Sequence, residues 1–98
     1  MATGAPRQKV TKLKLRLYVA GHAANSVQAL SNLRALCNEH FPSGHDLEVV
    51  DVLDHPRRAM EDGIVVTPTL LKLYPTPVQR IVGGLSDAAQ LLRVLAGT

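Results

Sequence analysis

The stretch LKLRLYVAGHAANSVQALSNLRALCNEHFPSGHDLEVVDVL, residues 13–53, decides the fold. Its first eight residues, 13–20, alternate leucine and valine with other side chains, and this period of two predicts a β-strand. Its last seven residues, 47–53, are rich in valine and predict a second, buried strand. A helical pattern lies between them. Strand, helix and strand in about 40 residues predict a βαβ unit with parallel strands and a right-handed crossover.

The helical pattern consists of apolar residues spaced three or four apart. They are Val27, Ala29, Leu30, Leu33, Leu36, Cys37 and Phe41. Such spacing gives an amphipathic helix of about four turns that packs one face on a sheet. Asn25 or Ser26 is the expected N-cap. The PSG sequence at 42–44 is expected to end the helix.

The second half predicts a short helix, a hairpin and a final helix. Asp54 is the expected cap of a helix that starts near Pro56 and stops at Gly63. We expect a strand at 69–74, a turn at 75–77 because prolines do not suit a strand interior, and a returning strand within 78–84. Ser86 or Asp87 is expected to cap the last helix. With Gln90, Asp87 makes a capping box. The resulting order is βαβαββα.

The length of 98 residues and the 46% of hydrophobic residues predict one α/β domain, residues 9–98, after a disordered tail at 1–8. The first twelve residues contain no apolar run typical of a signal peptide. No apolar stretch is long enough for a membrane span. We therefore expect a cytoplasmic protein without membrane contact.

Charge is distributed unevenly along the chain. Residues 1–38 contain six basic and no acidic side chains, whereas the remainder contains five basic and eight acidic ones. This asymmetry favours a basic edge that meets an acidic partner. It is equally typical of an edge strand on which lysines discourage aggregation. Nucleic acid is not expected as a partner, because only three aromatic residues are present and the basic charge is modest.

Catalytic chemistry has little support in the sequence. Cys37 is the only cysteine, so disulfide exchange by a cysteine pair is excluded. Its position on the apolar stripe predicts a buried core residue. The four histidines have no spacing typical of a metal site, and no nucleophile stands beside an orienting base. We therefore predict no enzyme activity, no catalytic residues, no metal and no cofactor.

Short motifs along the chain carry a resemblance to known proteins. VVTPTLL, residues 65–71, resembles the loop of thioredoxin-like proteins, in which Pro68 would follow a cis peptide bond. Three blocks then resemble the KaiB family: LRLYVAGHAANSVQAL at 15–30, VVDVLDHP at 49–56 and TPTLLKLYPTPVQRIVGGLSD at 67–87. The chain is identified as a member of that family from these blocks, which fall within residues 13–95.

The resemblance implies a regulator rather than an enzyme. KaiB proteins bind the hexameric ATPase KaiC on its N-terminal ring, capture KaiA and displace the kinase SasA. They are metamorphic: a ground-state tetramer has the order βαββααβ, and a rare monomer has the thioredoxin-like order βαβαββα. The resemblance therefore implies a homo-oligomer, tetramer or dimer, whose second half can switch fold.

By position in the family, the residues expected to contact a partner are Arg58, Glu61, Asp62 and Arg80. Pro68 is the expected structural cis-proline, and Gly83 and Gly84 are the expected fold-switch glycines, since glycine permits unusual backbone angles.

Several positions depart from the family pattern. Gly84 stands where Asp is common, Gln28 and Gln79 where Arg is common, and Gly63 where Lys is common. The sequence also ends at Thr98, where clock KaiB proteins continue into a longer acidic tail. The changes at Gln28, Gln79 and Gly63 remove basic contacts to partners, above all to KaiA. They favour a divergent KaiB paired with a KaiC outside a full three-protein clock, with a timing or stress-response output.

Two other interpretations remain open at this stage. One is a redox-inactive thioredoxin-like adaptor. The other is a detached sensor module like that of SasA, with no KaiC partner. Oligomeric state separates them from a fold-switching KaiB, because a simple adaptor is expected to be monomeric.

Overall fold

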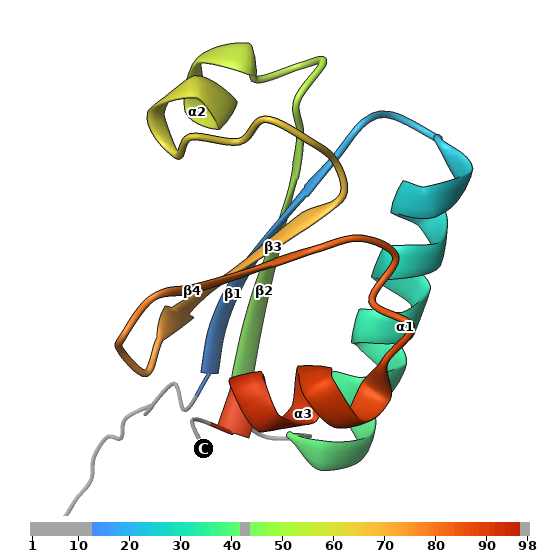
Figure 1. The fold of residues 1–98 in the computed structure, drawn as a ribbon, viewed down its shortest axis with the longest axis vertical. Helices are drawn as coiled ribbons and strands as arrows, with labels where there is room; N and C mark the ends of the chain where they lie inside the picture. The colour runs from blue at the N-terminus through green and yellow to red at the C-terminus, as the bar shows by residue number, and fades with distance from the viewer. Residues whose placement is uncertain (1–12, 42–43, 97–98) are drawn as a thin grey trace, which may run out of the picture.

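The computed structural model describes residues 13–41 and 44–96, and the predicted tail at 1–8 lies outside them. Seven elements follow one another: β1 (Leu13–Val19), α1 (Ala24–His40), β2 (His45–Asp51), α2 (Pro56–Glu61), β3 (Thr69–Tyr74), β4 (Gln79–Val82) and α3 (Ala88–Ala96). The order is βαβαββα, as predicted. Helices α1 and α3 lie on one side of the sheet and α2 on the other (Figure 1).

The four strands form one mixed sheet in the order β2-β1-β3-β4. Strand β1 runs parallel to β2 and antiparallel to β3, so Leu17 faces Val49 on one side and Leu70 on the other. Strand β4 pairs antiparallel with β3 and closes the predicted hairpin. The strand with the basic residues Lys14 and Arg16 is therefore internal. The expectation of a basic edge strand is wrong for these two residues, because strands pair on both sides of β1.

The second strand also differs from its prediction. It runs from His45 to Asp51 rather than from 47 to 53, and within it only Val50 is buried. The valine-rich sequence predicted burial on both faces, but β2 is an edge strand of the sheet. Val49 consequently keeps 38% of its surface exposed.

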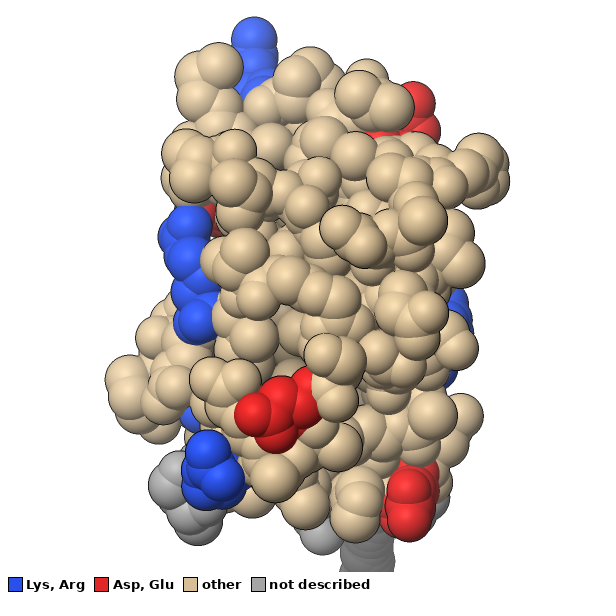
Figure 2. Space-filling model, turned by 45° about the vertical axis from the view of Figure 1, so that its right-hand side comes forward, with Lys and Arg blue, Asp and Glu red and all other residues tan. Residues whose placement is uncertain are grey.

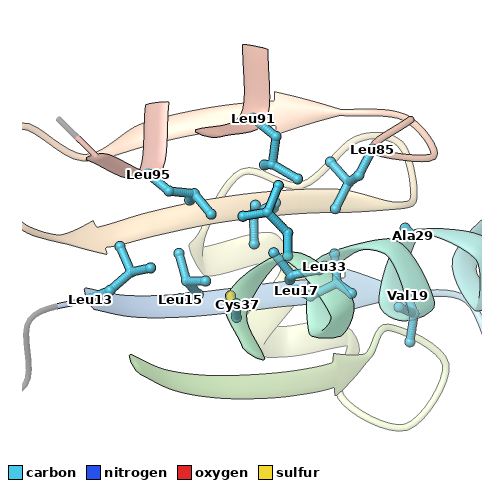
Figure 3. Packing of buried hydrophobic residues seen from close by; sticks show 12 residues of the cluster. Leu13, Leu15, Leu17, Val19, Ala29, Leu33, Cys37, Leu85, Leu91 and Leu95 are labelled. Carbon is cyan, nitrogen blue, oxygen red and sulfur yellow. The ribbon is translucent and has the colours of Figure 1, made fainter. Parts of the chain in front are cut away.

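The main core fills the space between the sheet and helices α1 and α3. Its buried members are Leu13, Leu15, Leu17, Val19, Ala29, Leu33, Leu36, Cys37, Leu70, Leu85, Leu91 and Leu95. In Figure 3, side chains from β1 point toward Leu33 and Cys37 of α1 and toward Leu91 and Leu95 of α3. Alternate residues of β1 supply one complete row of this core, as the period of two requires. Cys37 is fully buried, which confirms its predicted place in the core.

A smaller apolar cluster lies on the opposite face, beneath α2. Tyr18, Val50, Ala59 and Leu71 are its buried members. Because α2 has only six residues, it covers part of this face and leaves Glu48 of β2 and Arg80 of β4 exposed.

The helix starts show which local signals were reliable. Helix α1 begins at Ala24, so Asn25 and Ser26 are inside the helix rather than its cap, and the Ser26 hydroxyl accepts the Ala20 N–H at 3.1 Å. The N-cap of α2 is His55 rather than Asp54. The Asp87 cap of α3 is confirmed, because its Oδ1 accepts the Gln90 N–H at 3.0 Å.

Candidate partner-binding face

A row of four residues crosses the sheet on the face that carries α2. In register from β2 to β4, Glu48 lies opposite Arg16, Arg16 opposite Leu71, and Leu71 opposite Arg80. Directly opposed residues of paired strands point to the same side of a sheet. The row therefore places two guanidinium groups and one carboxylate on the open part of this face.

Asp62, at the end of α2, joins the helix to this row. Its Oδ2 accepts a hydrogen bond from the Tyr18 hydroxyl at 2.5 Å and another from Arg16 Nη1 at 3.0 Å. Its backbone carbonyl accepts Arg80 Nη2 at 2.9 Å, and the Gly63 carbonyl accepts Arg80 Nη1 at 2.8 Å. Asp62 is thus tied to β1 through its side chain and to β4 through its backbone.

Glu48 makes the other ionic contacts. Its Oε1 accepts Arg16 Nε at 2.8 Å, and Arg58 binds both carboxylate oxygens, with Nη1 2.8 Å from Oε2 and Nη2 2.9 Å from Oε1. A fork of two parallel contacts is the strongest geometry that arginine offers a carboxylate. The residues Arg16, Tyr18, Glu48, Arg58 and Asp62 are called the ionic cluster below.

The ionic cluster keeps its carboxylates charged. Hydrogen bonds from Arg58 and Arg16 lower the pKa of Glu48 to about 2. The hydrogen bond from Tyr18, with help from Arg16, lowers the pKa of Asp62. Burial raises the pKa of the Tyr18 phenol, so its hydroxyl remains a donor at neutral pH. At physiological pH the cluster is therefore a fixed set of opposite charges and not a proton switch.

Apolar side chains are exposed on α2 and in the segment that follows it, close in sequence to Arg58 and Asp62. Met60 on α2 is 78% exposed, and in the segment after the helix Val65 is 89% and Val66 47% exposed. Val65 and Val66 also line a shallow hollow of about 180 Å³ beside α2, whose other walls include Ile64. Exposed apolar residues rimmed by charges are typical of a protein-interaction surface. Met60, Val65 and Val66 are called the apolar patch below.

The structure brings together three of the four predicted partner-contact residues, Arg58, Asp62 and Arg80. Glu61 is exposed on the same helix, and no hydrogen bond or ion pair involves it among the residues described. The side chains of Arg58 and Asp62 are partly used in holding α2, whereas that of Glu61 is open to a partner.

Sequence reasoning missed Arg16, Tyr18 and Glu48. The signal was available, because the alternation that buried Leu15 and Leu17 also placed residues 16 and 18 together on the other face. The contact with Glu48 depends on the parallel register, which the sequence does not reveal.

The predicted structural residues lie away from the ionic cluster. Pro68 is buried, and the Thr67–Pro68 peptide bond is cis. Gly83 adopts a φ of +114°, in the region that favours glycine, and the Gly84 carbonyl accepts Asn32 Nδ2 at 2.9 Å. Both glycines belong to the connection between β4 and α3.

The start of α1 has no cysteine that could carry out thiol chemistry. The segment from Gly21 to Ala24, where a thioredoxin catalyst carries its cysteine, contains none. Cys37 is buried in the core, and burial raises the pKa of its thiol to about 11. Over residues 13–41 and 44–96, no group of three His, Cys, Asp or Glu side chains could hold a metal ion. In the same ranges no helix is long and apolar enough to cross a membrane.

Among residues 13–41 and 44–96, the side of the molecule on which α1 lies shows no charged patch in Figure 2. Figure 2 looks toward that side, and its Lys, Arg, Asp and Glu side chains are separated spots rather than a patch of one sign. A nucleic-acid surface would require basic side chains gathered along one stripe. The face with α2 is therefore the better candidate for a functional site.

Fold and site together define a class: a thioredoxin-like protein that lacks the cysteine pair of thioredoxins. The N-terminal domain of SasA from Synechococcus elongatus is similar, with a TM-score of 0.75 and 25% identity over 100% of this chain and 96% of that domain. Mitochondrial thioredoxin 3 from Saccharomyces cerevisiae has the same fold, with a TM-score of 0.72 at 16% identity over 90% of this chain and 80% of that one.

Sequence comparison gives the family. The KaiB domain model matches residues 16–96. The circadian clock protein KaiB3 of Synechocystis sp. is 41% identical over 83 residues, 85% of this chain and 81% of the relative. The circadian clock oscillator protein KaiB of Microcystis aeruginosa is 49% identical over 78 residues, 80% of this chain and 75% of the relative. The chain belongs to the KaiB family, as its motifs predicted.

Proposed function

We propose that this chain is a non-enzymatic regulator that binds a KaiC-type hexameric ATPase. The binding surface is the sheet face on which α2 lies, together with the β4 edge of the sheet. The observation that carries the proposal is the exposed apolar patch on and after α2, in a chain of the KaiB family. Met60 and Val65 keep more than three quarters of their surface exposed in the free chain. Covering such residues is the usual driving force of protein association.

The ionic cluster has a supporting role in this proposal. It fixes α2 against β1 and β2, so the apolar patch is presented in one orientation. A surface held rigidly before binding loses less conformational entropy on association. Glu61 and Arg80 are the charges that a partner would meet at the rim, where they act on specificity and association rate.

The family resemblance supplies the finer expectations. KaiB proteins rest as tetramers or dimers and bind KaiC in the thioredoxin-like arrangement, the arrangement seen here. We therefore expect slow binding, limited by the change from the resting oligomer. We also expect competition with a SasA-like kinase for the same KaiC surface, because the SasA sensor domain has the same fold. Capture of KaiA and a timing or stress-response output remain part of the proposal.

Size-exclusion chromatography tests the partner. The protein alone is expected to elute as a tetramer or dimer, and to join a KaiC-type hexamer after many hours with ATP. A protein that never joins the hexamer would contradict the KaiC proposal. A protein that stays monomeric and does not join the hexamer would instead favour a sensor module like that of SasA, whose N-terminal domain has a similar fold.

Two matched substitutions test the face. Val65→Glu places a charge in the apolar patch at a residue that is 89% exposed, so it is expected to abolish co-elution without unfolding the chain. Val27→Glu is the control, because Val27 is 53% exposed on α1, on the other side of the sheet. Equal binding by the two variants would show that this face is not the interface.

A further inference from the structure

The connection between β4 and α3 has a backbone that needs support. Gly83 has a φ of +114°, and Leu85 has a φ of +61° although it is not glycine. The left-handed region is unfavourable for residues with a side chain. Leu85 nevertheless adopts it and buries its side chain in the main core. The connection therefore stays in this form only while its surroundings hold it.

Asn32 of α1 provides a hydrogen bond at this point. Its Nδ2 donates to the Gly84 carbonyl at 2.9 Å, one residue before Leu85. Its Oδ1 accepts Gln28 Nε2 at 3.1 Å, one turn earlier on the helix. An amide that accepts on its oxygen from Gln28 is oriented with its nitrogen toward Gly84. The three residues form one chain of hydrogen bonds from α1 to the connection.

Two hollows adjoin the connection. A cleft of about 230 Å³ separates α1 from α3 here, and Asn32, Leu85 and Ser86 are among its walls. A second hollow of about 260 Å³ lies along residues 81–91, on the connection and the start of α3. Leu85 borders both hollows although its side chain is buried, so the hydrogen bond to Gly84 adds to core packing in fixing the backbone.

Two of the departures from the KaiB pattern meet in this chain of hydrogen bonds. Gln28 stands where arginine is common and Gly84 where aspartate is common, and Asn32 contacts both. Open space surrounds the position that a Gly84 Cβ would take, so the glycine is not required by crowding. The bond from Asn32 is made to the backbone carbonyl of Gly84, so it does not depend on the absence of a side chain there.

We propose that Asn32, oriented by Gln28, is a positioning residue that latches the β4–α3 connection and thereby keeps β4 and α3 on the sheet. Without the latch, Leu85 is free to leave its left-handed conformation and α3 loses its fixed position over β1 and β3. The proposal does not depend on the identity of any partner.

Amide hydrogen exchange of the full chain, followed residue by residue, tests the latch. Asn32→Ala is expected to speed exchange about fivefold in residues 79–96, the effect of losing one neutral hydrogen bond, while the amides of β1 and β2 change much less. Asn32→Asp is expected to have a larger effect, because a carboxylate cannot donate to the Gly84 carbonyl. Asn38→Ala is the matched control, an exposed asparagine on the same helix.

Gln28 distinguishes a latch from general destabilisation of α1. Gln28→Ala is expected to speed exchange in residues 79–96 about twofold in the native chain and to add nothing in the Asn32→Ala background, because the two residues act through one contact. Faster exchange spread evenly over the chain, additive effects of the two substitutions, or equal effects of Asn32→Ala and Asn38→Ala would each overturn the proposal.

Discussion

The two faces of the sheet are built from different chemistry. The face under α1 and α3 is closed, and rows of leucine from β1 meet the apolar sides of both helices. The face under α2 is only partly covered, and it combines a small apolar cluster with the ionic cluster and the exposed apolar patch. One strand, β1, supplies residues to both faces in alternation.

The difference indicates that one face mainly stabilises the fold and the other mainly serves recognition. Burial of apolar surface stabilises the fold without directional contacts, so it suits the face that holds the chain together. Ion pairs at a partly exposed face contribute little to stability but fix orientation and specificity. If this division is correct, substitutions on the first face change stability strongly, and substitutions on the second change it weakly.

The largest effect is expected in the closed core. Leu33→Ala removes a fully buried side chain from the middle of α1 and is expected to lower the free energy of unfolding by about 3 kcal/mol. Urea unfolding followed by circular dichroism measures the change. Val27→Ala, on the exposed side of the same helix, is the control and is expected to stay within about 0.5 kcal/mol. Similar losses for both would mean that α1 does not pack as described.

The next effect has the opposite sign and concerns a buried lysine on the closed face. Lys72 lies opposite Leu15, is 1% exposed, and its Nζ has no hydrogen-bond partner within the described residues. A buried, unpaired charge is costly, so Lys72→Met is expected to raise the free energy of unfolding by about 2 kcal/mol. Thermal unfolding measures this, with the exposed Lys14→Met as control. A destabilised Lys72→Met would show that the ammonium group has a partner in solution.

A smaller loss is expected from the hydrogen bond that anchors α2. Tyr18→Phe keeps the ring but removes the donor to Asp62, and is expected to cost about 1.5 kcal/mol at neutral pH. Because the folded-state pKa of Asp62 is lowered, this contribution is present above the ordinary pKa of aspartate, about 3.9, and is lost as the pH falls below that value. The cost of Tyr18→Phe measured by urea unfolding should therefore shrink at acidic pH. A cost that is independent of pH would contradict the assigned contact.

The smallest effect is expected at Glu48, whose side chain is 45% exposed. Glu48→Gln removes the carboxylate that Arg16 and Arg58 share, and is expected to cost less than about 1 kcal/mol at low salt and almost nothing at about 1 M salt. Because the pKa of Glu48 is lowered to about 2, the wild-type contribution is present above about pH 4.3 and is lost as the pH falls through 2. Urea titrations at two salt concentrations measure the difference. Glu61→Gln serves as the control, and a large, salt-independent loss would place Glu48 in the structural core.

Much of the fold could be predicted from hydrophobic periodicity. The strand at 69–74, the order of the seven elements and the buried position of Cys37 agree with the structure. The errors concerned the position of one strand within the sheet and the residues at which helices begin. The valines of residues 47–53 predicted a strand buried on both faces, but only the pairing order of the sheet shows that β2 lies at an edge. Cap residues were also ambiguous, since several adjacent candidates carry suitable side chains.

The candidate site was predicted only in part. Family resemblance predicted Arg58, Asp62 and Arg80 as partner-contact residues, and the structure places them together. The Arg16–Glu48 pair joins residues 32 positions apart through the parallel register, and Arg16 meets Asp62 from a position 46 residues away. Periodicity within a single strand cannot reveal such pairs. The apolar patch was missed for a different reason, because Val65 and Val66 lie between predicted elements, where hydrophobic periodicity does not show whether a side chain is buried or exposed.

The burial of the single thiol makes the chain convenient for site-specific chemistry. Cys37 is fully covered and its pKa is raised to about 11, so alkylating reagents at neutral pH meet an unreactive, inaccessible sulfur. A second cysteine introduced on the surface would therefore accept a fluorophore or spin label selectively, without replacement of the native one. The slow labelling that Cys37 itself undergoes would report how often the interior opens.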